Sequence, residues 1–255
     1  MNKKNISCII ATHNRDEFLI EAVNSIINQS KSPSEIIISN NYPNKKTQLL
    51  VEKIIEESDI EIKYIEHRMK GRGPASANLA ASKAKGDYLA FLDDDDLWEI
   101  KYLENILDLI SEKKSKIIYT WSNKIIKNQR YPHKQLKENL SMKDFLLTNP
   151  GCGISNLVVD KKLFVSLGGF DDYINPSYDK DFIIRAMYYG YQYNVLKNNL
   201  VTQRKDNHEQ LSNINKDFLL GMKKFFKKHE WIASPFIRIK FWIKYWKMYI
   251  KISVN

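Results

Sequence analysis

Four consecutive aspartates, Asp93 to Asp96, directly follow the apolar run Tyr88–Leu92. An apolar run of this length, preceded by Lys85-Gly86, is typical of a strand buried in a sheet. Adjacent carboxylates at the end of such a strand repel one another, because burial strengthens the interaction between like charges. Mg²⁺ or Mn²⁺ relieves this repulsion and is usually held by one or two carboxylates together with phosphate oxygens. The run therefore predicts a divalent-metal site, and a solvated acidic turn is the alternative.

Strand-like and helix-like segments alternate from the N-terminus to about residue 122. Apolar or alternating segments predict strands at 6–11, 35–39, 60–65, 87–92 and 116–121, and helical spacing predicts helices at 18–27, 44–57, 71–84 and 99–111. This order is typical of an α/β fold, a Rossmann-like, mostly parallel central sheet flanked by helices. Ligands of such sheets bind beyond the carboxyl ends of the strands. Thr12-His13-Asn14 and Ser39-Asn40-Asn41 follow the first two predicted strands, so we expect them to lie beside the aspartates.

The pattern is looser after residue 122. We expect a polar loop at 131–139, a strand at 156–159, a helix at about 179–189, and two short strands near 191–196 and 200–202. Neither an internal repeat nor a low-complexity linker interrupts the sequence. One large domain or two closely packed lobes are both compatible with 255 residues and 43% hydrophobic content.

The net charge of +10 is concentrated near the C-terminus. Residues 216–255 contain ten Lys or Arg and two acids, a net of +8, which leaves only +2 for the other 215 residues. The basic character therefore indicates little about the ligand of the main domain. The two cysteines, Cys8 and Cys152, form no disulfide framework and no metal-ligand spacing, and we expect a cytoplasmic protein without a signal peptide or a membrane-spanning segment.

Several motifs occur in an order that resembles the family 2 glycosyltransferases, which are inverting enzymes of the GT-A fold that use nucleotide-diphosphate sugars. The resemblance covers about residues 6–212. It rests on Ile9–Arg15 as the opening strand and turn, Gly86–Trp98 as the metal-binding "DxD" segment, Leu167–Asp171 as the turn before the acceptor side, and Tyr178–Arg185 as the "ED…D…R" helix start. The resemblance implies a glycosyltransferase domain over 1–212, with a nucleotide-sugar half (about 1–100) and an acceptor half (about 101–212), followed by a basic helical segment at 213–255.

The resemblance also implies roles for the acidic residues. Asp95 is expected to coordinate Mn²⁺ or Mg²⁺, and Asp93 to bind the ribose or complete the metal site. Asp94 and Asp96 occupy variable or helix-capping positions, with Asp94 placed at the nucleotide and Asp96 either an N-cap of the helix near Glu99 or a ligand. His208 is a further candidate metal ligand.

A second acidic pair is expected to act on the acceptor. Asp179 matches the general base that takes the proton of the attacking sugar hydroxyl, and helix N-terminal acids without a catalytic role are the alternative. Asp181 is expected to order the helix start, and Arg185 to pair with it at a spacing of four residues.

Residues around the nucleotide complete the expected donor site. These are Ala11, Thr12, His13, Asn14, Asn40 and Arg72, with His13 packed against the base. Where the family usually has two adjacent aspartates, this chain has Asn40-Asn41, and an amide suits uracil or thymine better than guanine. We therefore expect a UDP-sugar or dTDP-sugar donor. Ala77 stands where the family commonly has Arg, and Arg72 could supply that charge.

The segment 236–252 combines large apolar residues with Lys240, Lys244, Lys247 and Lys251 in one narrow helical stripe. Such a helix can lie in the interface of an anionic membrane, which would make the protein peripheral on the inner face of the cell membrane. The alternative is a helix that packs on the domain and exposes only its lysine stripe to solvent. We expect a glycan or lipid-linked glycan acceptor, as in bacterial surface polysaccharide or oligosaccharide synthesis, and the lipid-linked form would suit a membrane-bound enzyme. We expect no nucleic-acid partner, because no binding module accompanies the basic residues.

Two other functions compete with glycosyl transfer. Gly71–Ser76 follows a predicted strand, opens a helix and precedes acids by about 20 residues, as in an NAD(P)-dependent Rossmann oxidoreductase. Its last position is Ser in place of Gly or Ala, and four aspartates exceed what a ribose needs. The second alternative is a non-catalytic nucleotide-sugar-binding protein of the same fold. The transferred sugar, the acceptor, the linkage and the oligomeric state are not indicated by any motif.

Overall fold

The computed structural model describes residues 4–69, 72–127, 129–204 and 214–254, and the side chains of Arg72 and Val254 lie outside that description. Strands and helices alternate along the chain. The strands are β1 (Ile6–Thr12), β2 (Glu35–Asn40), β3 (Ile62–Glu66), β4 (Tyr88–Asp93), β5 (Asp96–Trp98), β6 (Ile117–Ile126), β7 (Gln129–Pro132), β8 (Leu157–Asp160) and β9 (Asn194–Arg204). The helices are α1 (Asp16–Ile27), α2 (Lys45–Glu57), α3 (Arg72–Lys83), α4 (Tyr102–Lys113), α5 (Asp144–Leu147), α6 (Lys161–Ser166), α7 (Tyr178–Tyr188), α8 (Lys216–His229) and α9 (Pro235–Val254).

A single mixed sheet runs through the molecule in the order β3-β2-β1-β4-β8-β6-β9-β5, with β7 paired to β6. The first four strands are parallel, as the alternating sequence pattern predicts. β8 is antiparallel to both β4 and β6, whereas β6 and β9 run parallel. Because β1, β2 and β4 end at the same edge, Thr12, Asn40 and Asp93 lie near one another.

The two faces of the sheet bury alternate residues of each central strand. Ile9, Ile37 and Phe91 face a core that includes small side chains of α3, and their neighbours Ile10, Ile38 and Leu92 face α1 and α4. Strands buried on both faces are near-continuous apolar runs, which is why these segments are recognisable in the sequence. The small side chains Ala77, Ala80 and Ala81 of α3, and Ala84 directly after it, are buried against the sheet. Ala77 therefore belongs to the core, which explains a small residue at this position.

Two predicted elements differ from the structure. The segments near 191–196 and 200–202 form one strand, β9, whose pairing with β6 shifts register around Trp121. The break between them is an irregularity in a continuous strand and not a turn. Residues 129–132, at the edge of the expected polar loop, form β7, all of whose residues are exposed.

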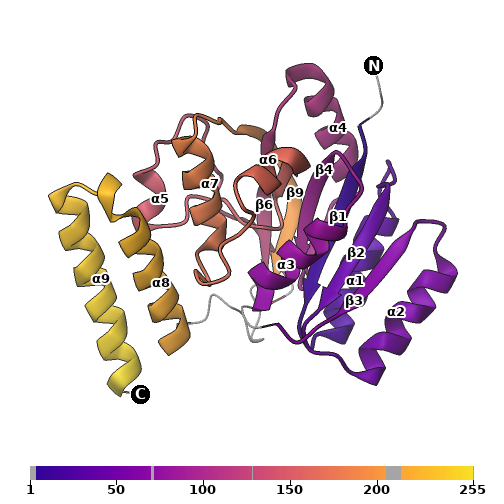
Figure 1. Ribbon diagram of the computed structural model, residues 1–255, viewed down its shortest axis with the longest axis horizontal. Helices are drawn as coiled ribbons and strands as arrows, with labels where there is room; N and C mark the ends of the chain where they lie inside the picture. Colours follow the sequence, from indigo (N-terminus) through magenta and orange to yellow (C-terminus); the bar gives the residue numbers. More distant parts are fainter. Residues whose placement is uncertain (1–3, 70–71, 128, 205–213, 255) are drawn as a thin grey trace.

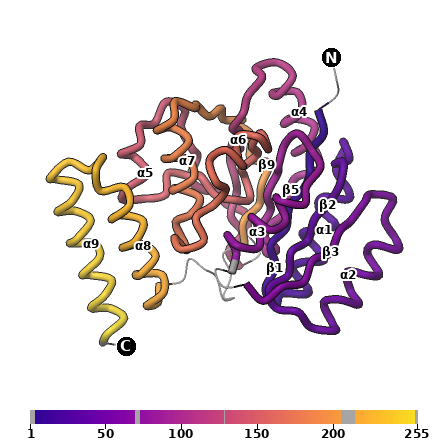
Figure 2. The backbone as a smooth tube through the Cα atoms, viewed as in Figure 1, coloured from indigo at the N-terminus to yellow at the C-terminus, as the bar shows by residue number. Residues whose placement is uncertain are grey.

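α8 and α9 lie side by side at the end of the molecule opposite α2 and β3 (Figure 1). The tube trace places α5 and α7 between these helices and the sheet (Figure 2). Phe226 of α8 stacks on Phe241 of α9 with ring centroids 3.7 Å apart, and both belong to the same core as α7. Of the helices in the described ranges, none is both long and apolar enough to cross a membrane.

α9 has two apolar faces. Phe241 is buried, and Ile237, Trp242, Tyr245, Met248 and Ile252 pack against the core. A second row of apolar side chains, here called the exposed α9 stripe, faces solvent: Phe236, Ile239, Ile243, Trp246 and Ile250. The helix therefore packs on the domain and still exposes an apolar surface.

Candidate active site

The turn between β4 and β5 brings carboxylates together. One carboxylate oxygen from each of Asp93, Asp95 and Asp96 lies within 4.8 Å of the other two. Burial, followed by the charges of Asp96, Asp95 and Asp94, raises the pKa of Asp93 well above its usual value. Oxygen ligands of this kind suit Mg²⁺ or Mn²⁺, whose charge would offset the repulsion. Asp93 and Asp95 were both expected as ligands, and the geometry favours the ligand alternative over the N-cap alternative for Asp96.

Asp96 is held by residues from two distant segments. Its Oδ2 accepts a hydrogen bond from Ser155 Oγ (2.6 Å), and its Oδ1 accepts one from the backbone N–H of Arg204 (3.1 Å). The same Ser155 hydroxyl lies 3.2 Å from Asp93 Oδ2. The expectation that Asp96 caps a helix is wrong, because residues 96–98 pair with β9 as β5 and α4 begins only at Tyr102.

Asp94 fixes the loop that follows β1. Its Oδ2 accepts hydrogen bonds from Thr12 Oγ1 (2.7 Å) and His13 N (3.2 Å), and Arg15 Nη1 lies 2.8 Å from its Oδ1. The side chain is buried. Both carboxylate oxygens are thus engaged within the protein, so Asp94 positions the loop after β1. It also lines the outer cavity described below, and its expected contact with the nucleotide stays a prediction.

No individual role was expected for Arg15, which contacts two of the aspartates. Its Nη1 lies between Asp94 Oδ1 (2.8 Å) and Asp95 Oδ2 (3.0 Å). Burial alone would lower the pKa of Arg15, but the charges of Asp94 and Asp95 outweigh burial and raise it. Arg15 therefore stays charged and offsets part of the negative charge of the cluster.

Two cavities meet at the aspartates. The first, of about 340 Å³, is lined by Asp93, Asp95, Asp96 and Asp179 among others, and here it is called the inner cavity. The second, of about 580 Å³, is lined by Ala11, His13, Asn14, Asp93 and Asp94 among others, and is called the outer cavity. Arg15, Asp93, Pro176 and Phe218 line both. Volumes of this size are typical of small-molecule sites.

Not every residue expected at the nucleotide reaches the outer cavity. The side chain of Asn40 is fully buried, donating to Tyr64 Oη (2.8 Å) and accepting from the N–H of Tyr42 (2.8 Å). Its amide thus holds the loop after β2 and is not presented to a base. Thr12, likewise buried, holds Asp94.

Exposed His13 and its neighbours offer a surface for a nucleobase. His13 Nδ1 lies 2.6 Å from Asn41 Oδ1, and the ring meets Tyr42 edge-to-face with centroids 5.1 Å apart. The prediction that His13 packs on the base stays a prediction. His208 and the side chain of Arg72 lie outside the described residues, so their expected roles stay predictions as well.

Asp179, at the start of α7, lines the inner cavity together with Asp93, Asp95 and Asp96. Its Oδ2 accepts a hydrogen bond from Asn149 Nδ2 (3.0 Å), and its Oδ1 accepts one from the N–H of Lys180 (2.7 Å). Burial raises the pKa of Asp179 to about 6, against the opposing charge of Lys180. A carboxylate with such a pKa is a stronger base than an exposed aspartate and is still ionised at neutral pH. Asn149, which orients it, comes from a loop without any recognisable motif.

The raised pKa of Asp179 predicts an acid limb in the pH profile. A general base works only when ionised, so we expect the rate of sugar transfer to rise with pH through about 6 and to level off above 7. Below pH 6 the rate should fall about tenfold per pH unit. Binding of a Mn²⁺–nucleoside diphosphate complex, measured over the same range, separates this effect from loss of metal. A transfer rate whose inflection stays near pH 4 would contradict the prediction.

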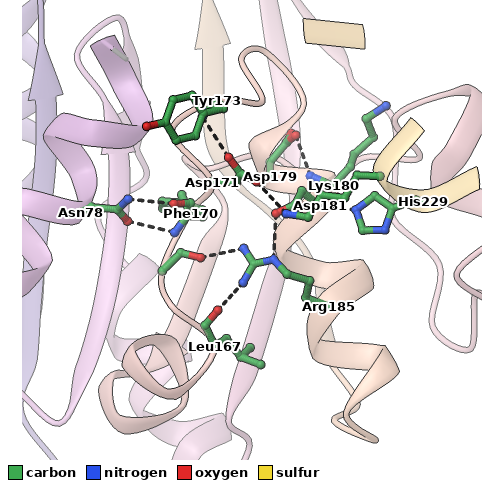
Figure 3. Close-up of polar contacts among 12 residues, drawn as sticks. Asn78, Leu167, Phe170, Asp171, Tyr173, Asp179, Lys180, Asp181, Arg185 and His229 are labelled. Carbon is green, nitrogen blue, oxygen red and sulfur yellow. Dashed lines mark hydrogen bonds and ion pairs between the residues drawn. The ribbon is translucent and has the colours of Figure 1, made fainter. Parts of the chain in front are cut away.

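Asp181 is fully buried and ties α7 to α8 (Figure 3). Arg185 Nε lies 2.8 Å from its Oδ2, and Lys228 Nζ and His229 Nε2 each lie 2.8 Å from its Oδ1. Despite burial, these partners lower the pKa of Asp181 to about 2. The expected pairing of Asp181 with Arg185 is confirmed. The contacts of Asp181 with Lys228 and His229 of α8 were not expected. His229 is 48 residues away in the sequence, and no local sequence pattern indicates such a contact.

Arg185 also anchors the turn before the acceptor side. Its guanidinium donates to the carbonyls of Leu167 (2.5 Å) and Gly169 (2.7 Å). Across this turn, Asn78 of α3 donates to the carbonyl of Phe170 and accepts from its N–H (Figure 3). Gly169 has φ +68°, and a Cβ there would lie 2.6 Å from Asn78 Oδ1, so glycine is required.

Replacing Asp181 by alanine should destabilise the fold. The change leaves Arg185, Lys228 and His229 without their shared carboxylate, and removing one partner of a buried ion pair costs about 3–5 kcal/mol. For a chain of this size the melting temperature should fall by about 10 °C. Thermal and urea unfolding measure the change. Asp108→Ala, which removes an exposed carboxylate from α4, is the control, and a loss below about 1 kcal/mol in Asp181→Ala would contradict the assignment.

Comparison with known proteins places the chain in a family. The profile of Glycosyl transferase family 2 matches residues 7–164. An uncharacterised glycosyltransferase of Methanocaldococcus jannaschii is 30% identical over 238 residues, which cover 86% of this chain and 77% of that protein. This chain is a member of glycosyltransferase family 2. The prediction from the motifs is confirmed, and the oxidoreductase alternative is wrong.

Another relative and two solved structures have more specific descriptions. The UDP-Glc:alpha-D-GlcNAc-diphosphoundecaprenol beta-1,3-glucosyltransferase WfgD of Escherichia coli is 26% identical over 159 residues, covering 62% of this chain and 61% of that enzyme. S. aureus TarS 1-349, solved in complex with UDP-GlcNAc, has a TM-score of 0.71 at 19% identity, covering 88% of this chain and 66% of that chain. The mannosyltransferase PcManGT of Pyrobaculum calidifontis, solved with GDP-Man and Mn²⁺, has a TM-score of 0.67 at 15% identity, covering 92% and 66%. These likenesses confirm the GT-A fold, and this chain spans about two thirds of the length of each of these three proteins.

Proposed function

We propose that this glycosyltransferase is metal-dependent and inverting, and that it moves a sugar from a UDP-sugar or dTDP-sugar to a hydroxyl of a lipid-linked glycan. The observation that carries the proposal is that Asp179 and the carboxylates of Asp93, Asp95 and Asp96 line the same cavity. The acceptor is suggested by the activity for which the Escherichia coli relative is named, and a divalent cation by the PcManGT complex with Mn²⁺.

The donor is proposed to lie in the outer cavity, with its diphosphate at Asp93 and Asp95. A divalent cation bound there would neutralise the charge that develops on the diphosphate as the bond to the sugar breaks. Arg15, held beside Asp95, adds a fixed positive charge to the same region. The preference for UDP over GDP rests on the Escherichia coli and TarS descriptions, since the buried Asn40 no longer supports it.

The acceptor is proposed to enter the inner cavity, where Asp179 takes the proton of the attacking hydroxyl. Attack from this side, opposite the leaving diphosphate, would invert the configuration at the sugar. Asn149 and the N–H of Lys180 would hold the carboxylate in position, since each hydrogen-bonds one of its oxygens while Asp179 lines the cavity.

The test is release of nucleoside diphosphate from a panel of UDP-, dTDP- and GDP-sugars. We expect release from a UDP- or dTDP-sugar with Mn²⁺ or Mg²⁺, and none with chelator. A protein that binds sugar nucleotides but releases no nucleoside diphosphate with any donor would be the non-catalytic alternative. Release only from GDP-sugars would refute the proposed donor class.

We further propose that the exposed α9 stripe, flanked by lysines, lies on an anionic membrane and makes the enzyme peripheral. Lys240, Lys247 and Lys251 are exposed beside the apolar stripe, as in helices that lie in a membrane interface. Cosedimentation with anionic liposomes at low salt should bind the protein, and Trp246→Glu should weaken binding about tenfold or more. Glu112→Gln on α4 is the control, and a wild-type protein left in the supernatant would disprove this role.

A further inference from the structure

The inner cavity carries opposite charges on different walls. The metal-binding aspartates and Asp179 supply the negative charge, and three lysines from separate segments supply positive charge: Lys134 beyond β7, Lys180 in α7 and Lys244 in α9. These lysines are far apart in the sequence. The family motifs and the proposed donor site do not account for this convergence.

Lys180 is the most constrained of the three. Its side chain is only 8% exposed, and its Nζ lies 4.2 Å from the centroid of the Phe225 ring. Among the residues that the structure describes, its ammonium makes no hydrogen bond or ion pair. A buried ammonium without an acceptor is costly, and its position on the cavity wall leaves it available to a ligand.

Lys134 and Lys244 are fixed to the same loop. Lys134 Nζ donates to the carbonyl of Asn149 (3.0 Å), and Lys244 Nζ donates to the carbonyl of Leu147 (2.7 Å). An ammonium has three donors, so each retains two for a ligand. Neither lysine has a carboxylate partner in the described part of the chain.

The three ammonium groups act on one another. Burial, opposed by the charge of Asp179 and aided by the charges of Lys244 and Lys134, lowers the pKa of Lys180 to about 8. Burial and the charge of Lys134 likewise lower the pKa of Lys244. Three cations that repel one another in a cavity form a site for an anion with several oxygens, just as the aspartates form a site for a cation.

The position of Lys244 connects this cation cluster to an apolar surface. Lys244 directly follows Ile243 of the exposed α9 stripe. A ligand with a phosphate in the inner cavity and a long apolar chain could therefore place that chain along α9. Charge and apolar surface together match an amphiphilic phosphate better than a free anion.

We propose that Lys134, Lys180 and Lys244 bind the phosphate or diphosphate that joins the acceptor glycan to a prenyl lipid, with the lipid lying along the exposed α9 stripe. This inference rests on the proposed function, which supplies a lipid-linked acceptor in the inner cavity. Lys180 is next to Asp179 in the chain. The phosphate would therefore lie close to the base, and the attacked hydroxyl would belong to a sugar near the phosphate.

The experiment measures binding of farnesyl diphosphate and of farnesol to the full chain in EDTA, by isothermal titration calorimetry. EDTA keeps a metal at the aspartates from recruiting the diphosphate. The variants are Lys180→Met and Lys244→Met, and the control is Lys113→Met, which removes an exposed lysine from α4, a helix that does not line the inner cavity. Inorganic pyrophosphate is titrated separately to distinguish a free anion from a lipid-linked one. Circular dichroism confirms that each variant is folded, and the exposed Lys244 provides a test even if Lys180→Met is unstable.

We expect wild type to bind farnesyl diphosphate at least about tenfold more tightly than farnesol or pyrophosphate, and each of the two lysine variants to lose about tenfold. Lys113→Met should bind as wild type does. Equal binding of farnesyl diphosphate and farnesol, or an equal loss in Lys113→Met, would overturn the inference. If pyrophosphate binds as tightly as farnesyl diphosphate, the proposal that the lipid chain lies along the exposed α9 stripe would be overturned. Nucleoside diphosphate release with Mn²⁺ is scored separately: if release persists while these titrations fail, only the inference falls, and if release is absent, the proposed function falls.

Discussion

Replacing Asp95 by alanine is expected to lower kcat/KM for sugar transfer by about 10³-fold, since a metal at a leaving group contributes several kcal/mol and each 1.36 kcal/mol is tenfold in rate. Asp95 is buried, its carboxylate lies within reach of Asp93 and Asp96, and its Oδ2 is 3.0 Å from Arg15. Its loss removes a metal ligand and leaves Arg15 with one carboxylate fewer. The measurement is nucleoside diphosphate release at saturating and limiting Mn²⁺.

The control for this variant is Asp108→Ala, which removes one carboxylate from an exposed position on α4. It should retain wild-type turnover. Asp95→Ala should also need a higher Mn²⁺ concentration for half-maximal rate. If Asp95→Ala turned over as fast as the control at limiting Mn²⁺, Asp95 would not be a ligand.

Replacing Asp179 by asparagine should lower kcat for transfer by about 10²–10⁴-fold, the range typical of losing a general base. Asparagine keeps the shape, and its carbonyl oxygen can still accept from Asn149 or from the N–H of Lys180. It cannot take a proton from the acceptor. Affinity for the Mn²⁺–nucleoside diphosphate complex should change little, because Asp179 lies outside the metal cluster of Asp93, Asp95 and Asp96.

Steady-state transfer assays at pH 8 measure the effect, with Asp108→Asn as the matched control. The residual activity of Asp179→Asn should lose the acid limb near pH 6 that is expected of the wild type, because that limb is assigned to the missing carboxyl. Retention of both the rate and the limb would assign the base to another group.

Sequence reasoning predicted the elements whose signals are local. β1, β2 and β4 are buried on both faces, so each appears as an apolar run, and Asp93 follows one of them. The pairing of Asp181 with Arg185 follows from helical spacing alone. The α/β fold could be inferred from these local signals, whereas the family was inferred from the resemblance of several motifs in order, such as Gly86–Trp98 and Tyr178–Arg185.

The remaining features of the site depend on contacts between distant segments. Ser155 reaches Asp96 across 59 residues, Asn149 reaches Asp179 across 30, and β5 exists only because β9 lies beside it. Asn40 is a residue for which the sequence suggested a role in the site that the packing does not support. Its residue type suited a base contact, but the packing of Tyr42 and Tyr64 around it engages both ends of its amide.

The most direct measurement is the affinity for UDP, dTDP and GDP, determined by calorimetry with Mn²⁺ and with EDTA in wild type and Asp95→Ala. The account predicts that the preferred nucleoside diphosphate binds wild type at least about tenfold more tightly with Mn²⁺ than with EDTA, and that Asp95→Ala loses most of this gain. Equal affinity with Mn²⁺ and with EDTA in wild type would contradict the claim that a cation at the aspartates holds the diphosphate.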